Sequence, residues 1–498
     1  MSERDRRRLA AGAGLVSQAR LVGGLLNMLV IVFLTRLLDK PGFAVVAFVY
    51  MVQETANALG PLGLPSAVSF FVPRLGPQVG RALGLQIGGI LVLLAIPWAL
   101  VLFFGGGLVA EWGKAPGAEG ALALVALSLL FDFPGQTLPG YLIAVEKFRG
   151  AFWVTLLFYV SRFASMVVPA ALGLDLLWII GLFAGVAILR GLAFVVYFVF
   201  IAEGERGPAV RSAWRRRDLF NYGLPLALSQ IVGKLNVQLD KYLIVTLCAA
   251  EVFAVYTVGA IELPLVPALA YSVTTALVPA LVVAWRDGAK SEFVSLWHAS
   301  SVKVALVMMP VFAAAFVLAG PLMRALFSAE YDEATVPFRV YLCLLPMRLC
   351  GYGAVVRALG RTRPVLLASL AGLIANAALN YPFYQLFGLA GPAVASIAAQ
   401  GVAIGMLLAV IRRELDLTWG TVMPWIQAAA PLAVAAVAAV PLALALPWLP
   451  SDGIALAVGS IGYFALYLAL GRAVGLLSGE DLRYVLHFLT GRMNRRGT

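Results

Sequence analysis

The chain has 498 residues, of which 62% are hydrophobic and only 12% are charged, and its mean hydropathy is +0.93. This composition excludes a soluble globular protein and is typical of a membrane protein. The formal net charge is +12, but the basic run at 206–217 is explained as the flank of a membrane span, so no nucleic acid is expected as a partner. The three cysteines lack metal-binding spacing, and we expect neither a metal nor a cofactor.

Apolar segments long enough to cross a bilayer recur along the whole chain. Because about 20 apolar residues make one span, the sequence predicts an all-α polytopic membrane protein with about fourteen membrane helices. They are expected at 9–38, 42–72, 82–104, 119–144, 150–172, 176–200, 219–247, 252–283, 295–319, 334–356, 364–387, 391–411, 424–447 and 454–471. The first is interpreted as an uncleaved span, because its apolar run is longer than that of a signal peptide.

The distribution of basic residues predicts the orientation. With a cytoplasmic N-terminus, 25 of the 37 lysines and arginines fall in cytoplasmic segments, and only 4 fall at outer ends or loops, namely Arg36, Lys40, Lys114 and Arg324. This bias places both termini in the cytoplasm.

Polar residues interrupt the first spans at helical spacing. Arg20 and Asn27 share a face of span 1, and span 2 carries Tyr50, Glu54 and Asn57 at i, i+4 and i+7. Such stripes are expected to face protein or water and not lipid. The segment 60–65 is rich in glycine and proline and should break span 2.

Spans 4 to 6 each carry a charged residue in their interior. Asp132 lies beside a second interruption, at 134–140, where it either caps the broken helix or has a functional role. Arg162 occupies the middle of span 5, and Arg190 in span 6 is expected to snorkel toward the cytoplasmic face.

Span 7 is the most polar of the predicted spans. Gln230, Lys234, Gln238 and Lys241 follow one another at steps of four, four and three residues, and Asp240 lies on another face. The length of this stripe favours a cavity lining over a purely structural ion-pair network. Spans 8 to 10 add further charged residues, namely Glu262, Lys303, Arg339 and Arg348, of which Arg339 is expected to be an interfacial anchor.

Part of the sequence is duplicated. Ser17-Gln18 returns as Ser229-Gln230, and 43–45 returns as 253–255, at offsets of 212 and 210 residues. Because six spans separate the copies, the halves are expected to be parallel repeats around a central cavity. The predicted domains are an N-lobe at 1–205, a C-lobe at 206–417, an accessory pair of spans at 418–475 and a basic cytoplasmic tail at 476–498.

The predicted interior has more cations than anions. When residues at the span ends are left out, eight basic residues lie within spans, against four acidic ones. A charge in mid-bilayer costs roughly 2.5–3.5 kcal/mol even on the lowest scales. An anionic substrate explains the excess, and the sequence therefore predicts a transporter for an anion.

Several short motifs, taken in order, resemble one family of transporters. They are Leu34-Thr35-Arg36-Leu37-Leu38, Gly63-Leu64-Pro65-Ser66-Ala67, Asn221-Tyr222-Gly223-Leu224-Pro225-Leu226, Leu239-Asp240-Lys241-Tyr242-Leu243-Ile244, Gly360-Arg361-Thr362-Arg363-Pro364 and Phe387-Gly388-Leu389-Ala390-Gly391-Pro392-Ala393. Over about the first 415 residues, the chain resembles the Wzx-type polysaccharide and O-antigen flippases of the MOP exporter superfamily.

The resemblance implies a function and a location. It implies that the protein moves an undecaprenyl-diphosphate-linked oligosaccharide from the cytoplasmic to the outer leaflet of the bacterial inner membrane. The movement would occur by alternating access of two lobes, and it would serve lipopolysaccharide or another surface polysaccharide. Membrane lipids, a polysaccharide polymerase and chain-length proteins are the implied partners.

The resemblance also implies roles for the polar residues of the spans. Cations would contact the diphosphate: Arg20, Lys234, Lys241, Arg162, Arg348 and Lys303. Neutral polar side chains would line the path of the sugar: Asn27, Tyr50, Asn57, Gln230 and Gln238. If an ion is coupled, its carriers would be the acids Glu54, Asp132, Asp240 and Glu262. Alanine at Arg20 or Lys234 is expected to abolish export.

Three alternatives remain open. Lipid II flippases are relatives, but their pattern has an Arg-Asp pair in span 1 and an arginine early in span 2, whereas Arg20 is followed by Leu21 and span 2 carries Glu54. A MATE-like multidrug antiporter for organic cations should have an acidic cavity. A membrane glycosyltransferase or ligase needs a larger outer loop, and both histidines, His298 and His487, fall on the predicted cytoplasmic side.

Overall fold

The computed structural model describes residues 3–75, 79–202, 216–263 and 277–477, and these ranges are helical and without β-strands. Eleven segments in them are long and apolar enough to cross a membrane. One of the eleven, Arg363–Glu414, contains two successive helices. The predicted all-α polytopic class is therefore confirmed, and the count of fourteen spans stays a prediction.

The chain divides into two compact units, Met1–Thr257 and Val258–Thr498. The lobe boundary predicted after residue 205 is a different division, and it stays a prediction. The helices of the first unit are α1 (Glu3–Leu37), α2 (Lys40–Leu59), α3 (Leu64–Leu75), α4 (Gly80–Phe104), α5 (Gly106–Trp112), α6 (Glu119–Gly135), α7 (Thr137–Ala144), α8 (Phe148–Ala171), α9 (Leu176–Val196), the π-helical turn η2 (Tyr197–Ile201), α11 (Arg216–Leu247) and α12 (Ala250–Gly259), which ends across the boundary.

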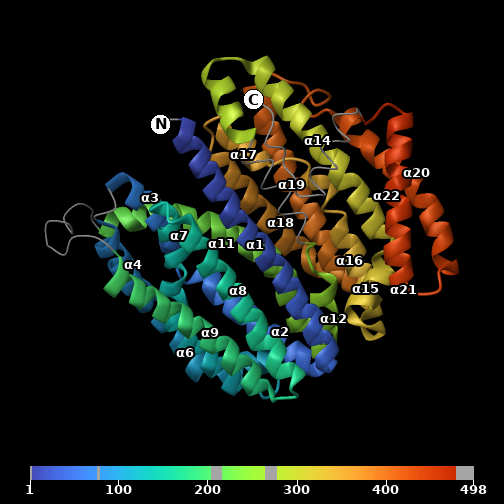
Figure 1. The fold of residues 1–498 in the computed structure, drawn as a ribbon. Coiled ribbons are helices and arrows are strands. Elements are labelled where there is room, and N and C mark those ends of the chain that lie inside the picture. Colours follow the sequence, from blue (N-terminus) through green and yellow to red (C-terminus); the bar gives the residue numbers. More distant parts are fainter. Residues whose placement is uncertain (1–2, 76–78, 203–215, 264–276, 478–498) are drawn as a thin grey trace. The chain divides into compact units, whose positions relative to one another are not determined.

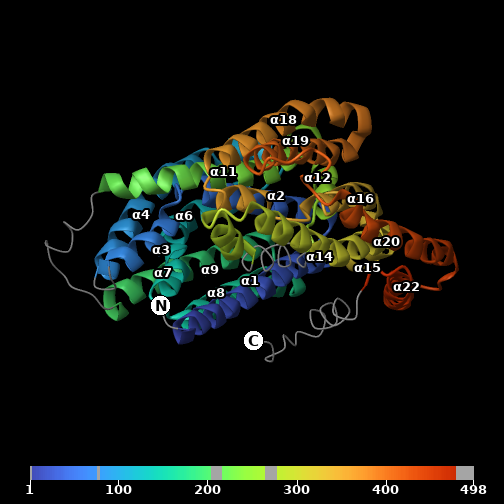
Figure 2. The same ribbon diagram turned by 90° about the horizontal axis from the view of Figure 1, so that it is seen from above.

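Long helices pack side by side in the first unit. α1 lies along α8, α6 lies between α4 and α9, and α11 lies against α2 and α3. The pairing of α1 with α8 can be followed in both views (Figures 1 and 2). The backbones of α9 and α6 lie very close together at Gly191, where an added Cβ atom would collide with the backbone of Phe131.

Both predicted helix interruptions are present. α2 and α3 are separated by a turn at residues 60–63, in which Leu62 and Gly63 have φ angles of 47° and 68°. α6 ends at Gly135 and α7 begins at Thr137, so the second interruption falls at Gln136. The glycines and prolines of these segments therefore located the breaks correctly.

The second unit holds the remaining helices. They are the helix Leu277–Arg286, α14 (Lys290–Val317), α15 (Ala319–Phe327), η3 (Ala329–Ala334), α16 (Thr335–Leu342), η4 (Pro346–Arg348), α17 (Tyr352–Ala358), α18 (Arg363–Phe387), η5 (Gly388–Ala390), α19 (Gly391–Glu414), α20 (Trp425–Ala445), η6 (Leu446–Trp448), α21 (Asp452–Ile454), η7 (Ala455–Gly459) and α22 (Ser460–Ala473). α18 packs along α19, and α20 packs on both α14 and α22. The buried hydroxyl of Tyr467 donates to the carbonyl oxygen of Leu306 at 3.1 Å and so joins α22 to α14.

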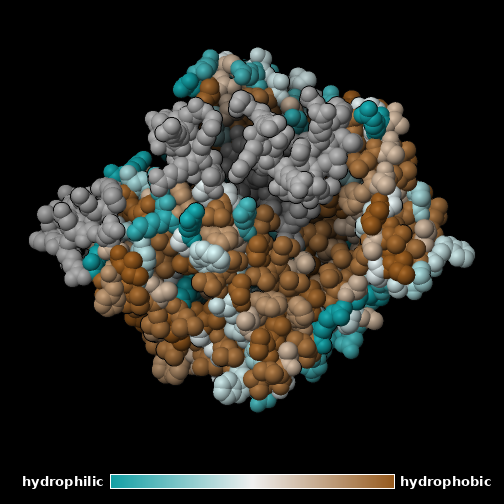
Figure 3. Space-filling view, in the orientation of Figure 1, coloured by the Kyte–Doolittle hydropathy of each residue, from teal (hydrophilic) through white to brown (hydrophobic). Residues whose placement is uncertain are grey.

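The outer face of α8 and α9 is apolar. Large side chains such as Trp153, Leu157, Trp178 and Leu182 are about half exposed there. Figure 3 shows hydrophobic colour over this part of the first unit. In water such a surface would drive aggregation, whereas in lipid it is solvated.

Candidate functional site

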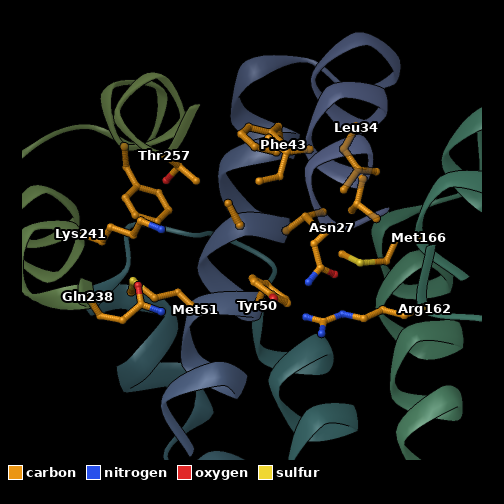
Figure 4. Close-up of a pocket in the computed structure, with 15 residues that line it drawn as sticks. Asn27, Leu34, Phe43, Tyr50, Met51, Arg162, Met166, Gln238, Lys241 and Thr257 are labelled. Atoms are coloured by element: carbon orange, nitrogen blue, oxygen red, sulfur yellow. The ribbon is translucent and has the colours of Figure 1, made fainter. Parts of the chain in front are cut away.

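A cavity in the first unit is bordered by residues of α1, α2, α8, α11 and α12 (Figure 4), and we call it the α2 cavity. It contains about 700 Å³ of empty space, part of it open to solvent. α2 contributes five residues spaced so that they share one face of the helix, namely Phe43, Val46, Ala47, Tyr50 and Met51. α2 therefore contributes more of the residues that line the cavity than any other helix.

The walls of the α2 cavity are mostly apolar, with polar groups on two sides. Arg162 of α8 points toward Tyr50 and Asn27 from one side, and Lys241 and Gln238 of α11 project from the other (Figure 4). Of the described residues that line the cavity, none is an aspartate or glutamate. The cavity thus combines apolar walls with two cations.

Arg162 is held in place by aromatic rings and by one carboxylate. Its side chain is almost fully buried, and its Cζ atom lies 4.6 Å from the ring centroid of Tyr50 and 5.4 Å from that of Phe183. Its Nη2 lies 3.4 Å from Oε1 of Glu54. The rings attract the guanidinium face and leave its edge available for hydrogen bonds.

Glu54 also contacts the polar stripe of α11. Its Oε2 lies 3.9 Å from Nζ of Lys234. These two residues border a second and smaller space, whose empty volume of about 220 Å³ includes open solvent, and which we call the Glu54 pocket. Gln238 lines both this pocket and the α2 cavity, so the two spaces adjoin at its side chain.

The structure describes the side chains of three of the four residues in the predicted polar stripe of α11. Lys234, Gln238 and Lys241 border one or both spaces, as expected for a cavity lining. The side chain of Gln230 lies outside the described residues.

Asp132 belongs to a separate buried network. Its Oδ1 lies 3.1 Å from Nη1 of Arg190, and its Oδ2 accepts a hydrogen bond of 2.8 Å from Nδ2 of Asn57. Nε2 of Gln136 donates to Oδ1 of Asn57 at 3.0 Å. The carboxylate thus bonds to α2 and α9, and α7 begins without a side-chain cap. The expectation that Arg190 snorkels is wrong, because its guanidinium lies on Asp132 and 4.3 Å from the ring centroid of Phe158.

Asp240 ties α11 to α12. Its carboxylate is buried, accepts a hydrogen bond of 2.9 Å from the hydroxyl of Tyr256 and borders neither described space. Its neighbour Lys241 turns the other way, into the α2 cavity. Adjacent residues of one helix therefore have different surroundings.

The other predicted site residues lie elsewhere. The side chain of Arg20 is exposed on α1 and borders neither the α2 cavity nor the Glu54 pocket. Lys303 is exposed on α14 of the second unit, and Arg348 forms an ion pair with Glu262 within that unit.

The C-terminal end of α11 is held by hydrogen bonds from residues that the sequence did not mark as important. The hydroxyls of Tyr242 and Thr55 are hydrogen-bonded to each other. Nζ of Lys114 donates to the carbonyl oxygens of Thr246 and Cys248 at 3.1 and 2.8 Å. Lys114 was predicted only as an outer-loop cation, and the short helix α5 before it is far below spanning length.

Solved structures identify the fold. The lipid II flippase MurJ in an inward closed conformation has a TM-score of 0.70 at 13% identity, over 92% of this chain and 98% of that one. An outward-facing multidrug resistance MATE family transporter of the MOP superfamily has a TM-score of 0.57 at 16% identity, over 82% and 96%. A MOP superfamily transporter from Pyrococcus furiosus, whose binding pocket is described as having reverse polarity, has a TM-score of 0.55 at 15% identity, over 82% and 96%. At these identities the likeness shows the fold alone.

Sequence comparison identifies the family. No curated protein matches the chain. The family described as "Polysaccharide biosynthesis protein" matches residues 9–285, which are more than half of the chain and include every residue that borders the α2 cavity. The chain therefore belongs to the polysaccharide biosynthesis protein family, and its fold is that of the MOP superfamily transporters.

Proposed function

We propose that the protein is a Wzx-type flippase that moves an undecaprenyl-diphosphate-linked oligosaccharide from the cytoplasmic to the outer leaflet of the bacterial inner membrane. The observation that carries the proposal is the α2 cavity, in which Arg162 and Lys241 face a largely apolar space. The ligand would have the same two parts, a hydrocarbon chain and an anionic diphosphate. Surface polysaccharide export is the process that such movement would serve.

The polar groups of the α2 cavity suit the head of this ligand. Arginine and lysine form charge-assisted hydrogen bonds with phosphate oxygens, and these are stronger where water is excluded. Asn27, Gln238 and Thr257 offer amide and hydroxyl groups for the sugar. The side-chain oxygens of Gln238 and Thr257 are buried and have no hydrogen-bond partner among the described residues, so a ligand hydroxyl would satisfy them.

The membrane potential favours the proposed direction. Moving one charge across 100 mV is worth about 2.3 kcal/mol, so two negative charges carried outward gain about 4.6 kcal/mol. A coupled ion is therefore not required. Among the acids predicted as carriers, Glu54 borders a described space, whereas Asp132 and Asp240 bond to neighbouring helices.

The test is a flipping assay with the purified full-length protein in proteoliposomes. A fluorescent undecaprenyl-diphosphate oligosaccharide should become accessible to a membrane-impermeant quencher faster than in protein-free vesicles. The double variant Arg162→Gln with Lys241→Gln should flip at the protein-free rate. Equal rates for wild-type protein and empty vesicles would contradict the proposal.

Lipid II is the second candidate substrate, because the MurJ fold covers 92% of this chain with a TM-score of 0.70. The same vesicles loaded with labelled lipid II distinguish the two, since the preferred substrate should flip faster at equal concentration. An organic cation is disfavoured, because the described lining of the α2 cavity contains no carboxylate to attract it.

The proposal extends to the surroundings of the protein. With cytoplasmic termini and a lipid-linked glycan delivered outside, the next proteins to act would be a polysaccharide polymerase and chain-length proteins. Complementation of a bacterial strain that lacks its own O-antigen flippase would place the protein in that sequence of steps.

A further inference from the structure

Glu54 lies between cations from two different helices. Arg162 of α8 approaches one carboxylate oxygen to 3.4 Å, and Lys234 of α11 approaches the other to 3.9 Å. Arg162 also borders the α2 cavity, where we propose that the substrate's phosphates bind. The guanidinium that would receive a phosphate therefore already has an anion beside it.

The two contacts of Glu54 differ in strength. The side chains of Arg162 and Glu54 are 9% and 25% exposed, so this pair is shielded from water. The side chain of Lys234 is 57% exposed, and its longer contact is screened. Glu54 is therefore chiefly a counter-ion of Arg162.

Lys241 has a different position from Arg162. It lies on the opposite side of the α2 cavity (Figure 4), and the adjacent carboxylate of Asp240 is turned to Tyr256. A ligand with one phosphate that takes Arg162 from Glu54 exchanges one ion pair for another. A ligand with two phosphates makes the same exchange and has a further charge for Lys241.

We propose that Glu54 is an internal competitor for Arg162, which an anionic lipid must displace before its phosphate can pair with the guanidinium. The inference rests on the proposed function. It makes Glu54 a residue that weakens anion binding at Arg162, at the same cost for a single phosphate as for a diphosphate, whose second charge adds a pairing with Lys241.

The variant that tests this is Glu54→Gln. The amide has nearly the shape of the carboxylate and still offers an oxygen to Arg162, so the helix contact is retained while the competing charge is removed. A ligand with a single phosphate should then bind Arg162 without displacing an anion. Glu54→Asp keeps the charge and should keep the competition.

The measurement is the affinity of the full-length protein, reconstituted in nanodiscs, for two polyprenyl lipids with the same sugar. One carries it through a diphosphate, and the other carries it through a monophosphate diester with a single negative charge. The wild-type protein and Glu54→Asp should prefer the diphosphate lipid. Glu54→Gln should bind both lipids more tightly than wild type, by at least about tenfold for the diphosphate lipid, which corresponds to about 1.4 kcal/mol.

Asp132→Asn is the matched control, because Asp132 is also a buried carboxylate paired with an arginine but borders neither described space. It should leave both affinities unchanged. Unchanged affinities in folded Glu54→Gln, or the same gain in Asp132→Asn, would overturn the inference and leave the proposed function standing. Wild-type protein that binds neither lipid would overturn both.

Discussion

Arg190 of α9 lies 3.1 Å from the carboxylate of Asp132 on α6, inside the first unit, and the other oxygen of that carboxylate accepts a hydrogen bond from Asn57 on α2. The pair therefore joins three helices. Removing one member of a buried ion pair leaves the other charge uncompensated and typically costs about 3–5 kcal/mol.

We accordingly expect Asp132→Ala to lower the free energy of unfolding by about 3 kcal/mol, at the low end of the range because Arg190 is 19% exposed. Chemical unfolding of the purified protein in detergent measures it. The double variant Asp132→Leu with Arg190→Met should recover part of the loss, because it leaves no unpaired charge. A double variant that is no more stable than Asp132→Ala would contradict this account.

The second prediction compares Lys241 with Arg20, which the resemblance groups together as cations that contact the diphosphate. Lys241→Ala should abolish flipping, because it removes a cation of the α2 cavity. Arg20→Ala should reduce it by less than about threefold, because the Arg20 side chain is exposed and borders neither described space. Flipping rates in proteoliposomes at matched protein content check both. The reverse order of effects would place the anion site away from the α2 cavity.

The third prediction concerns the close packing of α9 on α6. A side chain at Gly191 would collide with the backbone of Phe131, whereas nothing lies within 4 Å of a Cβ at Gly185 on the same helix. Gly191→Val should therefore destabilise the protein by about 1–3 kcal/mol or more, the usual cost of overpacking. Gly185→Val is the control and should unfold at nearly the wild-type temperature. Equal unfolding temperatures for the two variants would show that α6 and α9 pack less closely.

The fourth prediction concerns the end of α11. A cation at a helix C-terminus satisfies free carbonyl groups and is worth about 0.3–1 kcal/mol. Lys114→Met keeps most of the side-chain length but removes the charge, and it should speed hydrogen exchange in residues 243–248. Exchange in α18, which belongs to the second unit, should not change. Wild-type exchange at 243–248 would mean that the contacts of Lys114 with Thr246 and Cys248 contribute nothing.

Helix positions could be predicted because they depend on local sequence. An apolar run between charged or glycine-rich flanks predicted a span at 364–387, and the helix is Arg363–Phe387. The break after α2 was equally readable from the glycines and prolines at 60–65. In the same way, spacing along α11 identified the face that borders the two spaces.

Partners could not be predicted, because periodicity gives the face of a helix and not its neighbour. Glu54 and Arg162 are 108 residues apart, and nothing in either segment indicates their pairing. For the same reason, Arg190 was assigned to the membrane surface although its carboxylate partner lies on α6. Nothing in the sequence indicates that Thr257 borders a cavity, since a single hydroxyl in an apolar helix is common.

The contacts of α2 have a mechanical consequence. Four residues of its C-terminal half make different contacts. Tyr50 borders the cavity, Glu54 pairs with Arg162, Thr55 is hydrogen-bonded to α11 and Asn57 is hydrogen-bonded to Asp132. Tyr50 and Asn57 are separated by two turns of one continuous helix, about 10 Å along its axis. A helix this short is stiff, so any rotation that a ligand imposes at Tyr50 must appear as the same rotation at Asn57. A ligand-induced rotation of α2 at the cavity would therefore also change the hydrogen-bonded network of Asp132, because one rigid helix connects them.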